Sequence, residues 1–447
     1  MNFLKNKIVV IIIIALSIII AAFVVINKQS DTTTKQSKLD VVDANIKKYS
    51  LDITGATDTS AELQKMIDAS TTGSTITIPA GKYKFSNTVK LKDGIVLTAK
   101  NDVTIKGTGK NTLFAVGNSN SFSGIDFQNC GTALSVTKKS GLVVDNCKFT
   151  NKIDFAAINL SQVSDSSVTN SYFYDIRKYG ILIDNDSSNI TIDKNKFDNP
   201  EVFAGYKKEQ ISGHVYSLNG TKIKVTNNVL KNSGGQGVIF AYNSTTGKGT
   251  TDSVASNNHA EGNGQEGATI YGGEDKVTYG NSLIGNTCKN NRFNQIEVWE
   301  SDDNIVKDNT VEESLAGIGN LGAITLYDTK GTNVSSNKVL SAQTNGIEIT
   351  AGSYKCTITN NTVQNTNGKK NKDTVQEGNG ILLDSNGKSQ PQYITIKSNK
   401  ISSTKGTIAK SGIYSTSNKS QHNKIDGNTI SGYKDGLHEY AKMTMGE

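Results

Sequence analysis

Four carboxylates in the second half of the chain, Glu297, Glu300, Asp328 and Glu348, could carry out acid–base chemistry. Paired carboxylates supply the acid and the base or nucleophile that cleave glycosidic bonds. Trp299, the only tryptophan, lies between two of them in the sequence. Aromatic ring faces pack well against the apolar faces of sugars. We therefore expect this segment to bind a polysaccharide and to hydrolyse it.

A second group of residues could perform different chemistry. Arg177, Lys178, His214 and Tyr216 would supply the cation, base and acid that elimination or C5-epimerisation of a uronate requires. The enlarged loop between them adds Tyr206, Lys207 and Lys208. The structural alternative is that the lysines are solvated and that His214 only hydrogen-bonds its own loop.

The elements that must position these residues follow from a repeat. The pattern apolar-x-x-Asn-x-apolar recurs with its asparagine at Asn195, Asn228, Asn257, Asn286, Asn309, Asn337, Asn361, Asn399 and Asn428. Cys147 and Ser171 hold this place earlier in the chain. Spacings from 23 residues (286 to 309) to 38 residues (361 to 399) indicate a unit near two dozen residues with variable loops. Stacked asparagine amides at a tight turn can hydrogen-bond from coil to coil.

A strand precedes most of these turns, with a small residue followed by apolar, variable and apolar positions. Period-two alternation sends the apolar residues inward: Ile181, Val238, Ile296, Ile324 and Ile347, with Ile183, Phe240, Val298, Leu326 and Ile349. The residues between them are expected to face solvent. With only 35% hydrophobic residues, the chain suits an all-β solenoid, whose short coils each need few inward side chains.

Stacking the coils in parallel register places Tyr271, Trp299 and Tyr327 in one outward column on three consecutive coils. We expect this column to bind sugar, together with Tyr242 and Glu274. The structural alternative is that an aromatic ladder simply packs well on an exposed sheet.

The same stacking relates the four carboxylates. Glu297 and Glu348 lie two coils apart, which approaches the ~6.5–9.5 Å of an inverting hydrolase, whereas Glu300 and Asp328 on adjacent coils approach the ~5–5.5 Å of a retaining one. The like charges of Glu300 and Asp328 could instead raise the pKa of one of them or hold Ca²⁺. We expect no required cofactor and predict no defined metal ligands.

The N-terminal part of the exported chain is expected to cap the solenoid. Thr59 with Glu62 predicts a capping box, and Leu63, Met66 and Ile67 give one apolar face at helical spacing. Residues 75–83 then alternate as a strand and break at Pro-Ala-Gly. A short helix here would cover the open end of the first coil.

The first residues predict a membrane segment. Lys5 and Lys7 precede an uncharged apolar run, residues 8–26, that can nearly span a bilayer and shows no A-x-A cleavage signal. We expect a single-pass anchor in the cell membrane, with the N-terminus inside and the β-helix outside; a cleaved signal peptide and secretion are the alternative. The expected parts are residues 1–28 (anchor), 29–48 (spacer), 49–95 (cap and first coils), 96–432 (β-helix) and 433–447 (C-terminal cap or tail).

Charge and cysteine content exclude other classes. Removing Lys5, Lys7 and Lys28 from 48 basic residues leaves 45 against 41 acidic ones, about +4, so nucleic acid is not an indicated partner. No C-x-x-C pair occurs among Cys130, Cys147, Cys288 and Cys356, which are expected to be buried free thiols. The oligomeric state is left open.

These features together resemble the pectin-lyase-like superfamily of right-handed parallel β-helices, over roughly residues 50–430. The capped helix followed by Ile-Pro-Ala-Gly-x-Tyr is similar to its entry segment, and the Gly-Ile-x-Ile strands and Asn turns are similar to its coils. The resemblance implies a single right-handed parallel β-helix, and the superfamily hosts polysaccharide hydrolases, lyases and epimerases.

Some motifs of particular families are missing. No Asp-Pro-His signature of the alginate epimerases occurs, and Ser212-Gly213-His214 lacks the second glycine of the polygalacturonase Gly-His-Gly motif. The leading hypothesis is therefore a hydrolase of extracellular or cell-envelope polysaccharide. A uronate lyase or epimerase, and a non-catalytic glycan-binding surface protein, remain the alternatives.

Overall fold

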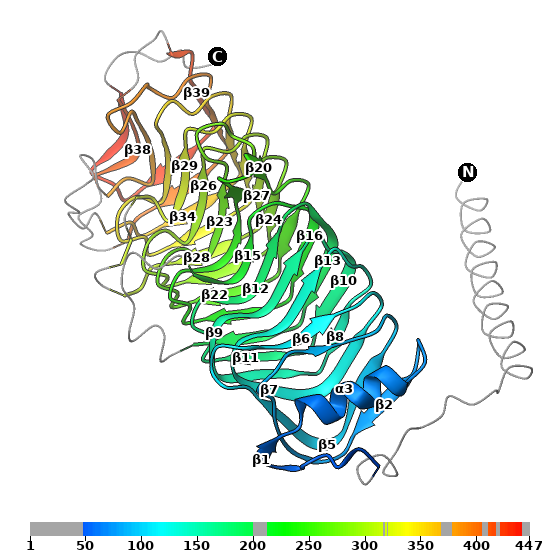
Figure 1. Cartoon of the computed structure of the whole chain (residues 1–447). Coiled ribbons are helices and arrows are strands. Elements are labelled where there is room, and N and C mark those ends of the chain that lie inside the picture. Colours follow the sequence, from blue (N-terminus) through cyan, green and yellow to red (C-terminus); the bar gives the residue numbers. More distant parts are fainter. Residues whose placement is uncertain are drawn as a thin grey trace, which may run out of the picture. The chain divides into compact units, whose positions relative to one another are not determined.

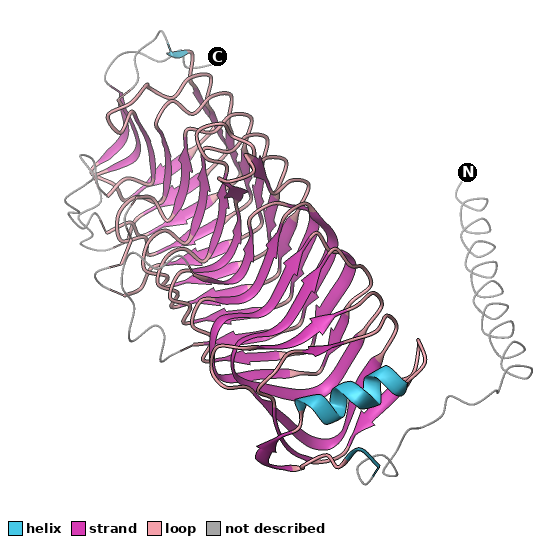
Figure 2. Cartoon of the chain, viewed as in Figure 1, coloured by secondary structure: helices cyan, strands magenta, loops and turns pink. Residues whose placement is uncertain are grey.

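The computed structural model describes residues 48–199, 212–315, 318–319, 321–367, 378–404, 410–416 and 421–439 (Figure 2). The predicted membrane segment, the spacer up to residue 47, and Tyr206, Lys207 and Lys208 lie outside these residues. Within the described ranges, no helix has the length and apolarity to cross a membrane.

Short parallel strands stack coil upon coil (Figure 1). From β10 onward each strand, apart from a hairpin at residues 242–249, pairs with its equivalent in the next coil, so that the solenoid has three faces. The first face contains β12 (Tyr179–Asp184), β15 (Gly213–Ser217), β18 (Gln236–Phe240), β23 (Ala268–Tyr271), β26 (Ile296–Trp299), β29 (Ile324–Tyr327), β32 (Ile347–Thr350), β35 (Ile381–Asp384), β38 (Ser411–Ser415) and β41 (Asp435–Glu439). This face carries the candidate site.

The other two faces complete each coil. The second contains β10 (Ser164–Thr169), β13 (Ser187–Asp193), β16 (Gly220–Thr226), β21 (Val254–Ser256), β24 (Ser282–Ile284), β27 (Ile305–Lys307), β30 (Asn333–Ser335), β33 (Thr357–Thr359), β36 (Thr395–Lys397) and β39 (Lys424–Asp426). The third contains β11 (Tyr172–Tyr174), β14 (Lys196–Asp198), β17 (Val229–Lys231), β22 (His259–Glu261), β25 (Thr287–Lys289), β28 (Thr310–Glu312), β31 (Lys338–Leu340), β34 (Thr362–Gln364), β37 (Lys400–Ser402) and β40 (Thr429–Ser431). Long strands in the first coils, β5 (Val96–Lys106), β7 (Ser121–Thr137) and β9 (Lys148–Ser161), pass around the corners and join the faces into one 39-stranded sheet.

The core of the solenoid is a stack of apolar side chains. All ten residues predicted to point inward from the first face are 0–1% exposed. Four phenylalanines, Phe127, Phe149, Phe173 and Phe197, stack along the third face with centroids 5.1, 4.7 and 4.2 Å apart. The four cysteines are free and buried, as predicted.

The asparagine ladder is present, with one correction. Asn228 N–H donates to Asn258 Oδ1 at 3.0 Å and Asn258 N–H donates to Asn286 Oδ1 at 3.0 Å, so the ladder runs through Asn258 and the prediction of Asn257 was wrong. Asn257 holds the preceding position, which is left-handed in successive coils and has φ of 54° here. The turn therefore uses two residues, one for the left-handed backbone and one for the amide bonds. Ser171 and Cys147 continue the ladder as predicted.

Helix α3 (Ser60–Ala69) lies at the start of the β-helix, after β1 (Thr54–Asp58) and before β2 (Thr75–Ile78) and β3 (Gly81–Lys84) (Figure 1). Its apolar face buries Leu63, Met66 and Ile67, as predicted. The prediction of a capping box was wrong, because the Thr59 side chain makes no hydrogen bond that caps the helix. Instead, Asp58 Oδ1 accepts hydrogen bonds from the N–H groups of Ser60 and Ser86.

Candidate functional site

Three aromatic side chains form one column on the outer surface of the first face, here called the aromatic column. Tyr271 is in register with Trp299, and Trp299 with Tyr327. The rings of Trp299 and Tyr327 are parallel, with centroids 3.5 Å apart and planes at 5°. Tyr327 is only 7% exposed, whereas Tyr271 and Trp299 are half-buried. The predicted geometry is present, and sugar binding by it stays a prediction.

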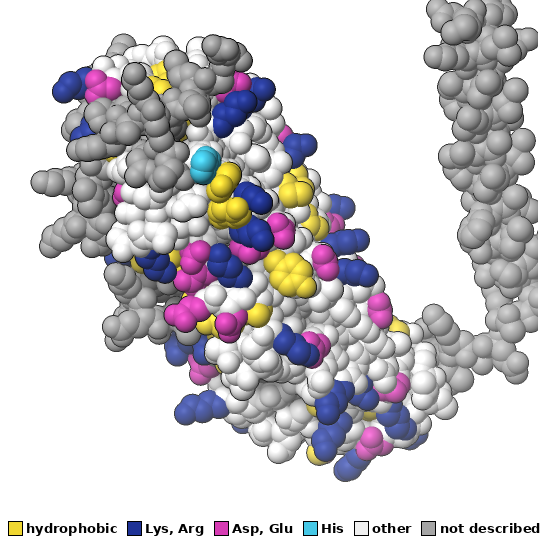
Figure 3. Space-filling model, turned by 90° about the horizontal axis from the view of Figure 1, so that it is seen from above, with side chains coloured by type: hydrophobic (Ala, Val, Ile, Leu, Met, Phe, Trp, Pro, Cys, Tyr) yellow, Lys and Arg dark blue, Asp and Glu magenta, His cyan; other side chains and the backbone are white. Residues whose placement is uncertain are grey.

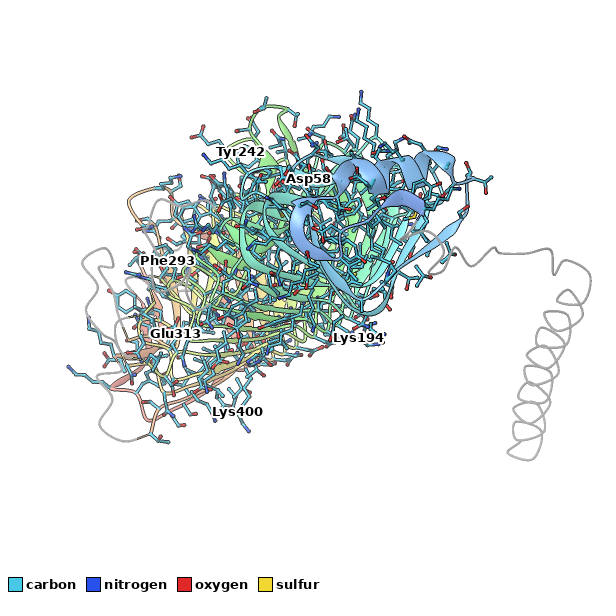
Figure 4. The ribbon with its side chains drawn as sticks, turned by 60° about the horizontal axis from the view of Figure 1, so that its bottom comes forward. Asp58, Lys194, Tyr242, Phe293, Glu313 and Lys400 are labelled. Carbon is cyan, nitrogen blue, oxygen red and sulfur yellow. The ribbon has the colours of Figure 1, made fainter. Side chains whose placement is uncertain are left out.

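Tyr242 extends the aromatic column by one coil. It belongs to a hairpin, β19 (Tyr242–Asn243) and β20 (Lys248–Gly249), and Figure 4 shows it near the edge of the coils. Its ring contacts that of Tyr271 at 5.4 Å and 67°. Gly273, with φ of 68°, lies under this ring, since a Cβ there would stand 2.6 Å from it. Glu274, also predicted to bind sugar, is exposed beside this position.

Two carboxyls approach each other next to the aromatic column, and we call them the carboxyl pair (Glu266 and Glu297). Glu297 lies opposite Thr269 on the neighbouring strand, and its Oε1 accepts a hydrogen bond from Asn294 Nδ2 at 2.7 Å. Glu266 accepts from Gln236 Nε2 at 3.2 Å, and its Oε2 lies 3.5 Å from Thr269 Oγ1. Glu266, at 6% exposure, thus lies beside Thr269, which is in register with Glu297 on the next coil.

The surroundings of the carboxyl pair favour protonation. Burial raises the pKa of Glu266 to about 7. Burial also raises the pKa of Glu297 well above its usual value, and the charge of Glu266 raises it further, while the hydrogen bond from Asn294 lowers it. Near neutral pH one member can therefore donate a proton while its neighbour accepts one, which is the division of roles that acid–base catalysis requires.

Glu266 was absent from the sequence-based prediction. Its column starts before the apolar strand pattern, so strand periodicity gave no reason to select it. A signal nevertheless exists, since Gln236, Glu266 and Asn345 each directly precede the small residue that opens the strand. Reading this position down the coils would have revealed a polar column beside Glu297.

Glu348 has the predicted position but a different setting. It lies in the column of Glu297 two coils further on, with Thr325 between them. Glu348 is only 2% exposed, its Oε2 accepts from Asn345 Nδ2 at 3.1 Å, and burial raises its pKa to about 7. Gly322 packs against it so closely that a Cβ at Gly322 would lie only 2.7 Å from Glu348 Cβ. Glu348 is therefore a packed residue, as is Glu266 at 6% exposure, whereas Glu297 is half-buried and better placed to meet a substrate.

Glu300 and Asp328 are held by lysines at the turn that follows the strands. Lys388 Nζ lies 3.8 Å from Glu300, and Lys276 Nζ lies 2.9 Å from Asp328 and 3.5 Å from Asp302. Burial raises the pKa of Glu300, whereas Lys388 lowers it and Asp328 raises it. No group of three or more potential metal-ligating side chains occurs among the described residues. These ion pairs make Glu300 and Asp328 weaker catalytic candidates than the carboxyl pair.

The outward residues of the earlier coils are apolar and covered, contrary to the expectation that they face solvent. A cluster separate from the main core contains Ala156, Tyr179, Leu182, Tyr216, Ile239 and Ala241, with Leu218 and Tyr271 packed against it. Leu182 and Ile239 are 6% and 2% exposed. Outward side chains cover one another because adjacent coils bring them together. The aromatic column thus continues into an apolar surface.

The second predicted group does not form one site. Arg177 pairs with Asp154 at 3.3 Å, and Lys178 Nζ lies over the ring of Phe155 at 5.6 Å. His214 is 1% exposed and its Nε2 lies 2.7 Å from Lys231 O. Burial lowers the pKa of His214 to about 4. Arg177 and Lys178 are exposed, and Tyr216 lies on the outer side of its strand at 8% exposure, whereas His214 faces the core. The prediction that these four residues share one site was therefore wrong.

The bend at the start of each first-face strand explains the position of His214. The flanking coils have Gly180 and Gly237 in this place, and a Cβ at Gly180 would stand 2.8 Å from the ring of Phe197, which belongs to the core. Side chains here point inward. His214 accordingly packs against Phe197, with centroids 5.3 Å apart.

Comparison with known proteins agrees with this architecture. The family described as right-handed β-helix region matches residues 92–249 and 246–430, and the family described as rhamnogalacturonase A/epimerase, pectate lyase-like, matches residues 44–100. No curated protein matches the chain by sequence.

Several solved structures share the fold at low identity. A tailspike protein mutant of E. coli bacteriophage HK620, in complex with a pentasaccharide, is 14% identical, with a TM-score of 0.57 over 85% of this chain and 76% of its own. The catalytic domain of a GH87 α-1,3-glucanase, in complex with tetrasaccharides, is 11% identical, with a TM-score of 0.52 over 88% and 67%. The A-module of the Azotobacter vinelandii mannuronan C-5 epimerase AlgE4 is 14% identical, with a TM-score of 0.51 over 89% and 99%. The chain belongs to the right-handed β-helix family and has the pectin-lyase-like architecture that its sequence resembles.

Proposed function

We propose that this protein is a polysaccharide hydrolase in which Glu266 and Glu297 act on the glycosidic bond. The observation that carries the proposal is the carboxyl pair itself, two neighbouring acids with raised pKa values. Glu297, whose pKa is raised further by its neighbour, is the general acid that protonates the leaving oxygen. Glu266 is the base or nucleophile.

The aromatic column provides the sugar-binding surface of this proposal. Tyr271 lies on the same strand as Thr269, and these two residues are in register with Trp299 and Glu297 of the next strand. Burial raises the pKa of Tyr271 to about 12, so its hydroxyl stays a hydrogen-bond donor at neutral pH. Solved β-helix proteins of similar fold bind a pentasaccharide and tetrasaccharides, which supports a glycan as the substrate class.

Charge favours hydrolysis over elimination. Elimination or epimerisation of a uronate requires a cation to neutralise the sugar carboxylate. Among the described residues beside the aromatic column, Lys276 and Lys388 are engaged with Asp328 and Glu300. A neutral sugar therefore fits the carboxyl pair better than a uronate.

The test uses the purified chain from residue 48 onward and a panel of α-1,3-glucan, polymannuronate, pectin and chitin. Wild-type protein should release new reducing ends from at least one polymer without the absorbance of unsaturated uronate. Glu297→Gln and Glu266→Gln should each lower turnover by at least about a hundredfold while circular dichroism stays unchanged. Glu300→Gln is the matched control and should keep most activity.

The same panel separates the alternatives. Absorbance of unsaturated uronate would indicate elimination instead of hydrolysis. A changed C5 configuration without cleavage would indicate epimerisation. Binding with no product would indicate a glycan-binding surface protein. Full activity of both Gln variants would remove the carboxyl pair from the mechanism.

Location and cofactor use are further parts of the proposal. The apolar run at residues 8–26 supports a membrane anchor with the β-helix outside the cell. Fractionation of cells expressing the full chain, with protease added outside, should find the β-helix in the membrane fraction and accessible. Hydrolysis should persist in EDTA, whereas loss of activity that Ca²⁺ restores would show a metal requirement.

A further inference from the structure

A second group of aromatic side chains lies on the turn that follows the first face, in later coils than the aromatic column. Tyr354 and Tyr393 meet edge to face at 5.3 Å, and Tyr393 stacks on His422 at 5.0 Å and 20°. Lys355 Nζ lies 5.1 Å from the ring of Tyr354. Tyr393 is 43% exposed, and His422 and Lys355 are also exposed. We call Tyr354, Tyr393 and His422 the turn strip.

Figure 3 shows one face of the molecule, on which hydrophobic side chains gather among charged ones. A histidine side chain lies there beside hydrophobic and basic side chains. A large exposed ring group on an otherwise polar surface marks a contact site more often than it marks packing.

The backbone at Tyr393 disfavours a bulky side chain. Tyr393 and His422 have φ of 55° and 54°, in the left-handed region. The same turn position holds Asp252, Gly280, Asp303, Gly331 and Lys355 in successive earlier coils, all with positive φ. Glycine and aspartate adopt this conformation readily, whereas a bulky ring does so at a cost.

Two successive coils therefore have rings at a turn position that holds aspartate, glycine or lysine in the earlier coils. A strained residue that the architecture does not require points to a function for its side chain. The ring of Tyr393 lies on the surface, where it contacts the rings of Tyr354 and His422.

One segment joins the turn strip to the aromatic column. Residues 384–393 run from the end of β35 to Tyr393, and Lys388 within this segment reaches back to Tyr327, with Nζ 4.9 Å from the ring centroid. The two aromatic groups thus lie on one continuous stretch of surface. A polymer on the aromatic column can extend over this segment to the turn strip.

We propose that Tyr354, Tyr393 and His422 form a second, non-catalytic binding site for the same polysaccharide that lies on the aromatic column. Rings with exposed faces and edges suit the C–H faces of sugars, and the imidazole and the ammonium of Lys355 supply donors to hydroxyls. The sugar chemistry of this inference rests on the proposed function. The site would hold long chains and leave short ones unaffected.

Tyr393→Gly is the decisive variant, because glycine removes the ring and fits the left-handed backbone. It should unfold at a temperature no lower than wild type. Native gels that each contain one soluble polymer of the panel identify the polymer that slows the migration of wild type. The same polymer should slow the migration of the variant at least fivefold less. Turnover of a short oligosaccharide of that polymer should be unchanged. Tyr354→Ala should weaken retardation likewise, whereas Tyr279→Ala, at 49% exposure and outside the turn strip, should not.

The outcomes separate this inference from the proposed hydrolysis. The proposal that the turn strip binds polysaccharide would be contradicted if Tyr393→Gly were retarded as much as wild type, or if no polymer retarded wild type. Glu297→Gln should lose turnover and keep full retardation. If retardation depends on Tyr393 but the protein cleaves no polymer, the turn strip is a binding site and the proposal of hydrolysis is wrong.

Discussion

Trp299 lies flat on Tyr327, with ring centroids 3.5 Å apart and planes at 5°. Lys388 Nζ lies 4.9 Å from the centroid of the Tyr327 ring, and Tyr327 is 7% exposed. The phenol therefore supports the indole, while Trp299 and Tyr271 keep exposed ring surface for a ligand.

Trp299→Ala should weaken glycan binding with little loss of fold stability. A lost aromatic contact is worth about 0.5–1.5 kcal/mol, or roughly two- to twelvefold in Kd. Calorimetric titration in a Glu297→Gln background measures binding without turnover. Tyr279→Ala is the control for removal of an exposed ring. Equal affinity of Trp299→Ala and its parent would assign the aromatic column to packing.

The register of the site could be predicted from the sequence because parallel coils repeat side-chain direction every two residues. Ile296 and Val298 point inward, so Glu297 and Trp299 must point outward. The expectation of solvent exposure failed at Glu348, because outward side chains of adjacent coils cover each other.

Other features depend on information that periodicity lacks. Positions 257 and 258 are both asparagine, and only the backbone conformation determines which of the two side chains joins the hydrogen-bonded ladder. Strand alternation also does not show that the chain bends at His214 and turns that ring inward. The contact of Lys388 with Tyr327 joins residues from different coils through a loop that carries no repeat.

The asparagine ladder gives a direct stability test. Asn258 Nδ2 donates to Asn286 Oδ1 at 3.0 Å and to Val225 O at 2.8 Å, inside the structure. Asn258→Ala removes the amide donor to Val225 O and the amide oxygen that accepts from Asn228 N–H and Nδ2. The loss of these buried hydrogen bonds should cost about 1–3 kcal/mol in unfolding free energy. Asn257→Gly is the matched control, because glycine suits its φ of 54° and should be neutral or slightly stabilising. Urea unfolding followed by circular dichroism compares them, and an equal cost at both positions would contradict the two roles.

Glu313 (Figure 4) predicts how stability depends on pH. It is 0% exposed, and burial raises its pKa from 4.5 to about 7. The folded state therefore holds the proton more tightly than the unfolded state. The resulting stability is fully present below about pH 4.5 and is lost as the pH rises through about 7. At ~1.4 kcal/mol per pKa unit, the loss is on the order of 3 kcal/mol.

Glu313→Gln removes this titration. Urea unfolding of wild type and variant at pH 5 and pH 8 should show that wild type loses more stability over this interval. Glu266 and Glu348, which also have raised pKa values, titrate in both proteins, so their effect cancels in the comparison. Parallel losses in the two proteins would show that Glu313 is ionised in the fold.

Gly273 tests whether Tyr242 is part of the binding surface. Gly273 and Gly247 have similar φ of 68° and 65°, but a Cβ at Gly273 would stand 2.6 Å from the ring of Tyr242, whereas a Cβ at Gly247 meets nothing within 4 Å. Both alanine substitutions should cost about 1 kcal/mol of stability from the left-handed backbone. Only Gly273→Ala should also displace Tyr242, which contacts Tyr271, and raise the Kd for the glycan several-fold. If Gly247→Ala weakened binding as much as Gly273→Ala, backbone strain in this region, and not the position of the Tyr242 ring, would control the affinity.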